Sequence, residues 1–283
     1  MRTLIIIIAA SAVRFAQVNG SAAQPQNHSI RPDARAIVGP SIAATDQSWR
    51  ARIHYTYLQR DEDRRLDAHG LVRSDDVEVS TIIFVNGVPF EQLVEHNGRP
   101  PSAEEQRKQK DKLSKLKRET REERITRLRQ EEENNTSLIR EVPLAFDFEL
   151  IGEEVVNGRP AYVLQATPHP GYRGRGQYGA MFSRVNGKLW VDKEDFGWVK
   201  ADGQVIQPFS IGLFLARVLP GSHITMEQTR VGDGIWMPKH VEVRAAAKIF
   251  FIKSLIIDKV LTYSGYRPAQ TGITATPGGR AVP

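Results

Sequence analysis

An alternation of apolar and polar residues, broken by short turns, most constrains what this chain can fold into. The alternation occurs at 49–60, 76–85, 140–150, 160–167 and 187–192, and it resumes after residue 223. A period of two residues is typical of strands with one face buried and the other exposed. Three similar Asn-Gly turns, Val85-Asn86-Gly87, Val156-Asn157-Gly158 and Val185-Asn186-Gly187, each predict a hairpin. A fourth turn is expected at 231–234. The sequence therefore predicts a mainly β (α+β) fold of antiparallel strands.

One segment, residues 102–134, interrupts this pattern because it lacks Gly and Pro and is rich in helix-forming residues. Ser102 and Glu105 form the pattern of a capping box at its start, and opposite charges recur at helical spacings. Its apolar residues make a thin stripe of Leu113, Leu116, Ile125 and Leu128. We expect one long charged helical insertion that rests on the sheet without being buried.

The later apolar segments predict that both faces of the sheet are covered. Residues 249–252 offer large apolar groups to both faces, and such a sheet needs cover on both. The stretch 209–218 is short enough for a buried strand and long enough for a helix, and we favour a short helix lying over the sheet.

The ends of the chain differ from its centre. Residues 1–23 have the features of a signal peptide, since one Arg precedes a short apolar run and small residues follow. The run is too short to span a bilayer, and an uncleaved N-terminal anchor is the alternative interpretation. We predict a flexible linker at 24–45, a single β domain with the helical insertion at 46–268, and a disordered tail at 269–283.

The stretch 190–198, WVDKEDFGW, places three carboxylates between two tryptophans and raises the question of an acid/base site. The flanking strand patterns and Gly197 instead predict that residues 193–196 connect a hairpin, with the acidic residues in the turn. Asp192 and Glu194 would lie roughly 7 Å apart in an extended chain. This spacing leaves a hydrolase as a third hypothesis, behind two that involve no catalysis.

No other motif predicts catalysis or a cofactor. The seven histidines lack metal-site spacing, and the chain has no nucleophile elbow, phosphate-binding loop or zinc-protease motif. Cysteine is absent, which excludes disulfides, a lipidation cysteine and a thiolate nucleophile. We therefore predict that the protein is not an enzyme and has no catalytic residue, metal site or cofactor.

The formal net charge of +6 favours binding to anionic surfaces. The basic stretch 169–178 mixes Arg, Gly and aromatic residues, a composition found in proteins that bind single-stranded nucleic acid. Export would disfavour nucleic acid as a partner, so Arg173 and Arg175 are candidates for contact with a lipid headgroup or membrane. A mobile basic loop at the rim of the sheet is the simpler interpretation.

Large apolar side chains are abundant in the second half of the chain. The candidates for a ligand-binding cavity are Trp190, Trp198, Phe209, Phe214, Trp236, Phe250 and Phe251. A curved sheet with helices across its concave side would leave an apolar cavity suited to acyl chains, whereas ordinary core packing is the alternative for each residue.

The second half also resembles the LolA/LolB-like superfamily of outer-membrane lipoprotein carriers and receptors. The resemblance rests on GKLWVDKEDFGWVKADGQV, on the Gly-x-Trp-x-Pro turn at Gly234-Ile235-Trp236-Met237-Pro238, and on the closing VLTYSGYR. It covers residues 144–267, with 49–94 as opening strands. It implies an incomplete antiparallel β-barrel, lidded by helices, that binds lipid or lipoprotein acyl chains in the periplasm. The insertion at 102–134 and the missing lipidation cysteine depart from this pattern.

Taken together, the sequence predicts a periplasmic or secreted half-barrel that carries or senses a lipid-like ligand. The alternative is a non-catalytic envelope protein whose core is filled by its own side chains and whose charged helix docks a protein partner.

Overall fold

The computed structural model describes residues 33–174, 181–211, 216–249 and 253–269. Its strands are β1 (Tyr55–Leu66), β2 (Val72–Val85), β3 (Val88–His96), β4 (Phe146–Val156), β5 (Arg159–Pro168), β6 (Val185–Asp192), β7 (Trp198–Val205), β8 (Phe209–Ile211), β9 (Ala216–Val218), β10 (His223–Gly232), β11 (Ile235–Ile249) and β12 (Lys253–Pro268). Within these residues the twelve strands form one sheet, in the order β3-β2-β1-β12-β11-β10-β7-β6-β5-β4, with β9 joining β8 to β11. All strand pairings in the described part of the chain are antiparallel, and its two end strands, β3 and β4, do not pair there, which confirms the predicted half-barrel.

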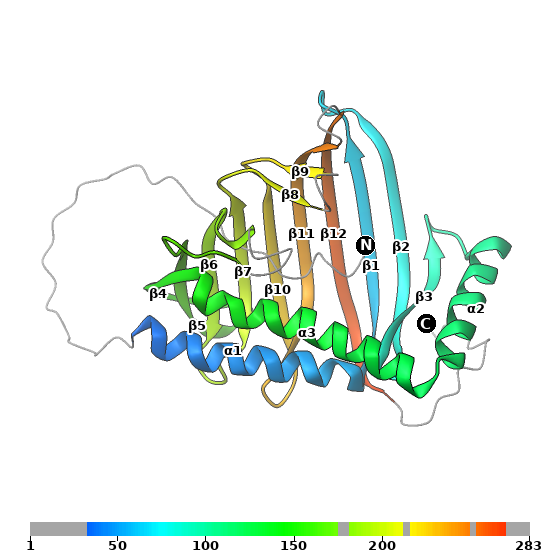
Figure 1. Ribbon diagram of the computed structural model, residues 1–283, viewed down its shortest axis with the longest axis horizontal. Helices are drawn as coiled ribbons and strands as arrows, with labels where there is room; N and C mark the ends of the chain where they lie inside the picture. The colour runs from blue at the N-terminus through cyan, green and yellow to red at the C-terminus, as the bar shows by residue number, and fades with distance from the viewer. Residues whose placement is uncertain (1–32, 175–180, 212–215, 250–252, 270–283) are drawn as a thin grey trace, which may run out of the picture.

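Helices cover one face of this sheet. They are α1 (Ala34–Ala51), the short 3₁₀ helix η2 (Arg52–His54), α2 (Ala103–Arg118) and α3 (Arg121–Ala145). Helices α1 and α3 lie side by side across the strands, and α2 lies beside β3 at one end of the sheet (Figure 1). None of the described helices has the length and hydrophobicity needed to cross a membrane.

Strand alternation divides the buried residues between the two faces. The larger cluster contains Leu164, Leu189, Trp198 and Leu261 and includes Ile37 of α1, so it lies under the helices. A smaller cluster consists of Ala161, Val163, Trp190, Val199 and Trp236. Because neighbours such as Leu189 and Trp190 fall in different clusters, both faces of this part of the sheet are apolar.

Two of the three predicted Asn-Gly hairpins are confirmed. Asn86 and Asn157 have φ values of 55° and 51° and connect β2 to β3 and β4 to β5. The turn predicted at 231–234 is also confirmed, since β10 ends at Gly232 and β11 begins at Ile235. The third prediction, at Val185-Asn186-Gly187, is wrong. These residues lie within β6, where Gly187 pairs with β5 and with β7.

The predicted charged helix is two helices. Its start at Ser102 is confirmed, because Ser102 and Glu105 form the capping box of α2. The chain then breaks at Glu119, and Thr120 with Glu123 forms a second capping box that begins α3. Helix α2 buries none of its residues, as the thin apolar stripe predicted.

Four further predictions are corrected by the helices and strands. Residues 49–54, expected to begin a strand, complete α1 and form η2, and β1 begins at Tyr55. Residues 34–45, expected in a flexible linker, belong to α1, which buries Ile37, Val38, Ser41 and Ser48. Small residues at helical spacing let α1 approach the sheet without a continuous apolar run. Residues 140–145 continue α3 rather than forming a strand. The described parts of 209–218 are the strands β8 and β9 rather than a helix. The predicted signal peptide at 1–23 and residues 270–283 of the predicted tail lie outside the described residues.

Candidate ligand-binding cavity

A cavity of about 240 Å³ lies between the sheet and the helices that cover it. Its walls come from α1, α2 and α3 and from strands β1, β2, β3, β7, β10, β11 and β12. The apolar part of the lining includes Ile82, Phe84, Ile139, Trp198, Met226 and Leu261. For scale, an engineered apolar cavity of about 150 Å³ accommodates benzene. The space is therefore large enough for part of an apolar ligand.

A second cavity, of about 60 Å³, adjoins the same side chains. It is lined mainly by apolar residues of α3 and strands β4 to β7, among them Phe146 and Phe148, and by Phe182 from the turn that precedes β6. Trp198 and Met226 line both cavities. These two residues therefore separate or connect the two spaces, depending on their rotamers.

Two hydrogen-bond donors in the lining of the larger cavity have no partner within the described structure. They are the Tyr263 hydroxyl and the Trp198 indole Nε1, in residues that are 5% and 8% exposed. A buried polar group without a hydrogen bond costs about 1–3 kcal/mol. Such groups are rare in native proteins, and an acceptor from an ordered water, an ion or a ligand would satisfy each one.

Three tyrosines cluster beside this part of the lining. The Tyr57 ring lies 6.1 Å from that of Tyr263 and 4.9 Å from that of Tyr266, measured between centroids. Burial raises the pKa of Tyr57 to about 12 and also raises the pKa of Tyr263 and of Tyr266. All three hydroxyls are therefore protonated at neutral pH. The Tyr266 hydroxyl donates to the Pro238 carbonyl at 2.5 Å, which distinguishes it from Tyr263.

Another part of the lining is charged. Arg52 of η2 stacks on Trp49, with its Cζ 3.4 Å from a ring centroid, and donates to the Trp49 carbonyl at 3.1 Å. Burial lowers the pKa of Arg52 to about 10, so its guanidinium remains charged at pH 7. Lys112 of α2 and Glu131 of α3 also line the cavity. The cavity thus has an apolar wall, two unpartnered donors and charged groups of both signs, the cations Arg52 and Lys112 and the carboxylates Asp61, Glu91 and Glu131.

The aromatic residues singled out from the sequence are only partly brought together. Trp198 and Trp236 line the cavity. Phe209 is buried in the larger core cluster, and Trp190 packs in the smaller cluster while donating to Glu154 at 2.7 Å. Neither of them lines the cavity. Phe214, Phe250 and Phe251 lie outside the described residues.

The structure describes one of the two basic residues that were predicted at the rim. Arg173 is exposed and does not line the cavity, and Arg175 lies outside the described residues. Sequence reasoning missed Arg52, Tyr57 and Tyr263, which do line it. Their strand or helix positions give no local signal, because the cavity forms where η2, β1 and β12 meet.

The acidic stretch between the tryptophans forms the predicted hairpin. Residues 193–197 connect β6 to β7, with Phe196 N donating to the Asp192 carbonyl at 3.1 Å. Asp192 is fully buried, which the sequence did not indicate, and its carboxylate accepts from Arg159 at 2.6 and 2.8 Å. The backbone amides of Glu194 and Asp195 also donate to it, at 2.9 and 3.1 Å.

These contacts give Asp192 a structural role. Burial alone would raise the pKa of Asp192, but the hydrogen bonds from Arg159 and from the backbone outweigh burial and hold the pKa below its usual value. A carboxylate that is kept ionised and saturated with donors is unsuited to act as a general acid or base near neutral pH. The geometry therefore favours the hairpin interpretation over the hydrolase.

Comparison with known proteins gives weak similarities. No protein-family model matches the chain, and no curated protein matches it. Among solved structures, a DUF1329 family protein from Desulfovibrio piger is 14% identical, with 86% of this chain and 96% of that chain covered and a TM-score of 0.33. A LolA superfamily protein from Nitrosomonas europaea is 11% identical, with the same coverage and a TM-score of 0.29. A chain in the structure of the Pseudomonas aeruginosa MucA/MucB complex is 13% identical, with coverage of 83% and 99% and a TM-score of 0.24.

The LolA superfamily, which the sequence resembles, is thus represented among the similar solved structures. TM-scores this low carry no argument about what the chain binds.

Proposed function

We propose that this protein is a non-catalytic carrier or sensor of an amphiphilic, lipid-like ligand in the bacterial periplasm. The observation that carries the proposal is the cavity under α1 and α3, which combines an apolar wall with two unpartnered buried donors. The features of a signal peptide at 1–23 support a location outside the cytoplasm.

The apolar wall would supply the affinity for an acyl chain. Each buried methylene contributes about 0.8 kcal/mol. Trp198 and Trp236, two of the residues singled out from the sequence, are assigned to this binding surface together with Met226 and Leu261. Because the cavity exists before the ligand binds, little of this energy would be spent on rearranging the sheet.

The two donors would select the polar part of the ligand. Tyr263 and Trp198 can each donate one hydrogen bond, and neither has an acceptor within the described residues. A carboxylate, ester or amide oxygen would fit them, whereas a pure hydrocarbon would leave both unpaired. We therefore assign the ligand to the acyl compounds that carry such an oxygen.

Cationic groups would hold an anionic headgroup. Arg52 and Lys112 line the cavity and are proposed for this role. The exposed Arg173 remains a candidate for contact with a membrane surface. Helices α2 and α3 contribute Lys112, Glu131 and Ile139 to the walls, so movement of the charged helical segment would open or close the cavity.

A protein partner is the second candidate, and one observation favours it. Helix α2 buries none of its residues and carries many charges, as a docking surface would. A partner that binds α2 without displacing a cavity ligand would support this candidate in place of the carrier.

A displacement experiment with an apolar fluorescent probe tests the carrier. Thr45 of α1 lines the cavity, so Thr45→Trp would place an indole in it. Thr126→Trp makes the same change at an exposed position of α3 and serves as the control. We expect the unmodified protein and the control to bind the probe and release it to a fatty acid, with Thr45→Trp at least tenfold weaker. Equal binding by both variants would contradict the proposal.

A further inference from the structure

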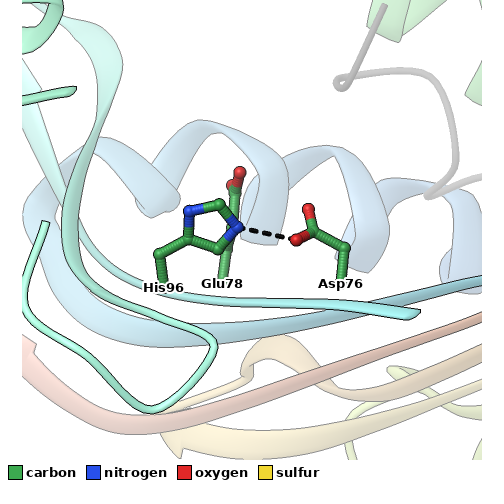
Figure 2. A group of neighbouring side chains, drawn as sticks. All are labelled: Asp76, Glu78 and His96. Carbon is green, nitrogen blue, oxygen red and sulfur yellow. Dashed lines mark hydrogen bonds and ion pairs between the residues drawn. The ribbon is translucent and has the colours of Figure 1, made fainter. Parts of the chain in front are cut away.

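Three metal-ligating side chains converge on β2 and β3, at the edge of the sheet beside α2. Figure 2 shows Asp76, Glu78 and His96 rising from the same side of the strands, and their ligand atoms lie within 4.8 Å of one another. Asp76 and Glu78 are two residues apart on β2 and therefore share a face, while His96 pairs with Glu78 across the antiparallel strands. All three are half-buried, which leaves access from solvent.

Further residues orient these side chains. His96 Nδ1 lies 2.6 Å from Glu105 Oε1, and His96 Nε2 lies 2.6 Å from Asp76 Oδ1. Glu105 is itself fixed, because the Ser102 backbone amide and hydroxyl each donate to its Oε2 at 2.7 Å. Asn97 Nδ2 donates to Asp76 Oδ1 at 3.1 Å.

This arrangement matches the outer shell of a protein metal site. A metal-ligating histidine usually donates its other ring N–H to a carboxylate, which fixes the tautomer and the ring orientation. Here Glu105 occupies that position at Nδ1, and Nε2 points toward Asp76, with Glu78 beside the ring (Figure 2).

We propose that Asp76, Glu78 and His96 bind a divalent first-row transition-metal ion such as Zn²⁺. One imidazole nitrogen with two carboxylate oxygens suits zinc better than magnesium or calcium, which prefer oxygen alone. At zinc–ligand distances of about 2.0–2.2 Å, tetrahedral ligand atoms lie roughly 3.4 Å apart. The three side chains would reach this spacing by small rotations, and the fourth position would hold water.

The site does not depend on the proposed function. It would join β2 and β3 directly and would reach the first turn of α2 through Glu105. Bound metal would therefore stabilise the attachment of α2 to the edge of the sheet, whatever the cavity holds.

Calorimetric titration of the chelator-treated full chain with ZnCl₂ tests the proposal. Glu78→Gln removes a ligand with little change of shape, and His96→Ala removes another. His69→Ala is the matched control, because His69 is exposed in the turn between β1 and β2. Histidine ring NMR signals, recorded with added Zn²⁺, identify which imidazole binds.

We expect one Zn²⁺ per chain, a shift of the His96 signals, and at least about tenfold weaker binding in Glu78→Gln and His96→Ala. His69→Ala should bind as the unmodified protein does. If His96→Ala does not fold, the Zn²⁺ affinity of Glu78→Gln and the histidine NMR signals of the unmodified protein still test whether this site binds the metal. Absence of binding, binding unchanged by both ligand variants, or equal loss in His69→Ala would overturn the proposal.

Discussion

Replacing Tyr263 by Phe should stabilise the ligand-free protein while weakening its binding of an acyl ligand. The change removes a single hydroxyl that is buried against the cavity and lacks a hydrogen-bond partner among the described residues. The ring, with its contacts to Tyr57 and the core, is kept. On the proposed function the two effects have opposite signs, because a bound ligand would pair the hydroxyl that has no partner among the described residues.

The magnitudes follow from the cost of an unpaired group. A buried donor without an acceptor costs about 1–3 kcal/mol, so Tyr263→Phe should raise the free energy of unfolding by at least about 1 kcal/mol. For a domain of this size, 1 kcal/mol corresponds to roughly 2–4 °C in Tm. A hydrogen bond to a charged carboxylate contributes about 1.5–3 kcal/mol. Its loss should weaken the binding of a fatty acid by roughly tenfold or more.

Urea denaturation and ligand titration measure both effects, and Tyr266→Phe is the matched control. The Tyr266 hydroxyl donates to Pro238, so removing it leaves a carbonyl without its partner and should lower stability by about 1 kcal/mol. Removal of one hydroxyl is thus expected to raise the free energy of unfolding at Tyr263 and to lower it at Tyr266. If Tyr263→Phe destabilises the protein as Tyr266→Phe does, then the Tyr263 hydroxyl is not an unpaired donor and the reasoning about ligand polarity is refuted.

Two further predictions concern the hairpin between β6 and β7. Asp192→Asn should lower the free energy of unfolding by about 2 kcal/mol at pH 7. The change replaces a fully buried carboxylate by a neutral amide and leaves the Arg159 guanidinium without its charged partner. The pKa of Asp192 is lower in the folded than in the unfolded protein. Its contribution to stability is therefore complete above the unfolded-state pKa of about 3.9 and is lost as the pH falls through the folded-state pKa. Thermal unfolding at pH 7 and pH 2.5 checks this, and a difference between the proteins that does not shrink in acid would contradict it. Gly197→Ala should destabilise the protein by about 2 kcal/mol or more, because a Cβ there would overlap the Trp236 indole. A stability equal to that of the unmodified protein in urea would show that the indole can move aside.

Local patterns in the sequence were sufficient to predict most of the long strands and two of the three Asn-Gly hairpins, but not the helical residues 49–54 and 140–145 or the short strands β8 and β9. Asn86 and Asn157 adopt the left-handed conformation because each lies between strands that pair with one another. Asn186-Gly187 is the same dipeptide but lies in a different structural environment. Its strand lies between two partners, so backbone pairing on both sides overrides the turn preference.

The sequence contained a local signal for the boundary between α2 and α3, but the uninterrupted run of helix-forming residues outweighed it. Thr120 and Glu123 have the same capping-box spacing as Ser102 and Glu105, and they divide the charged segment into α2 and α3. Because residues 102–134 lack Gly and Pro, a helix boundary within this segment was not predicted. Helix α1 was missed because its buried face combines Ile37 and Val38 with the small residues Ala34, Ser41 and Ser48, and so forms no long apolar stripe.

The cavity could not be predicted residue by residue. Trp198 and Tyr263 are far apart in the sequence, and the pairing of β7, β10, β11 and β12 brings both to one space. The burial of Asp192 likewise depends on Arg159, which is 33 residues away. The sequence identifies residue types suited to a ligand or a turn, whereas strand order decides which of them meet.

Mass spectrometry of lipids extracted from the purified protein tests the central claim most directly. The full chain would be expressed with its N-terminal segment, isolated from the periplasm without detergent, and compared with Thr45→Trp. The carrier account predicts a near-stoichiometric acyl compound that carries a carboxylate, ester or amide oxygen, and a marked loss of it in Thr45→Trp. A native protein that contains no such compound and does not bind an apolar probe would contradict the account.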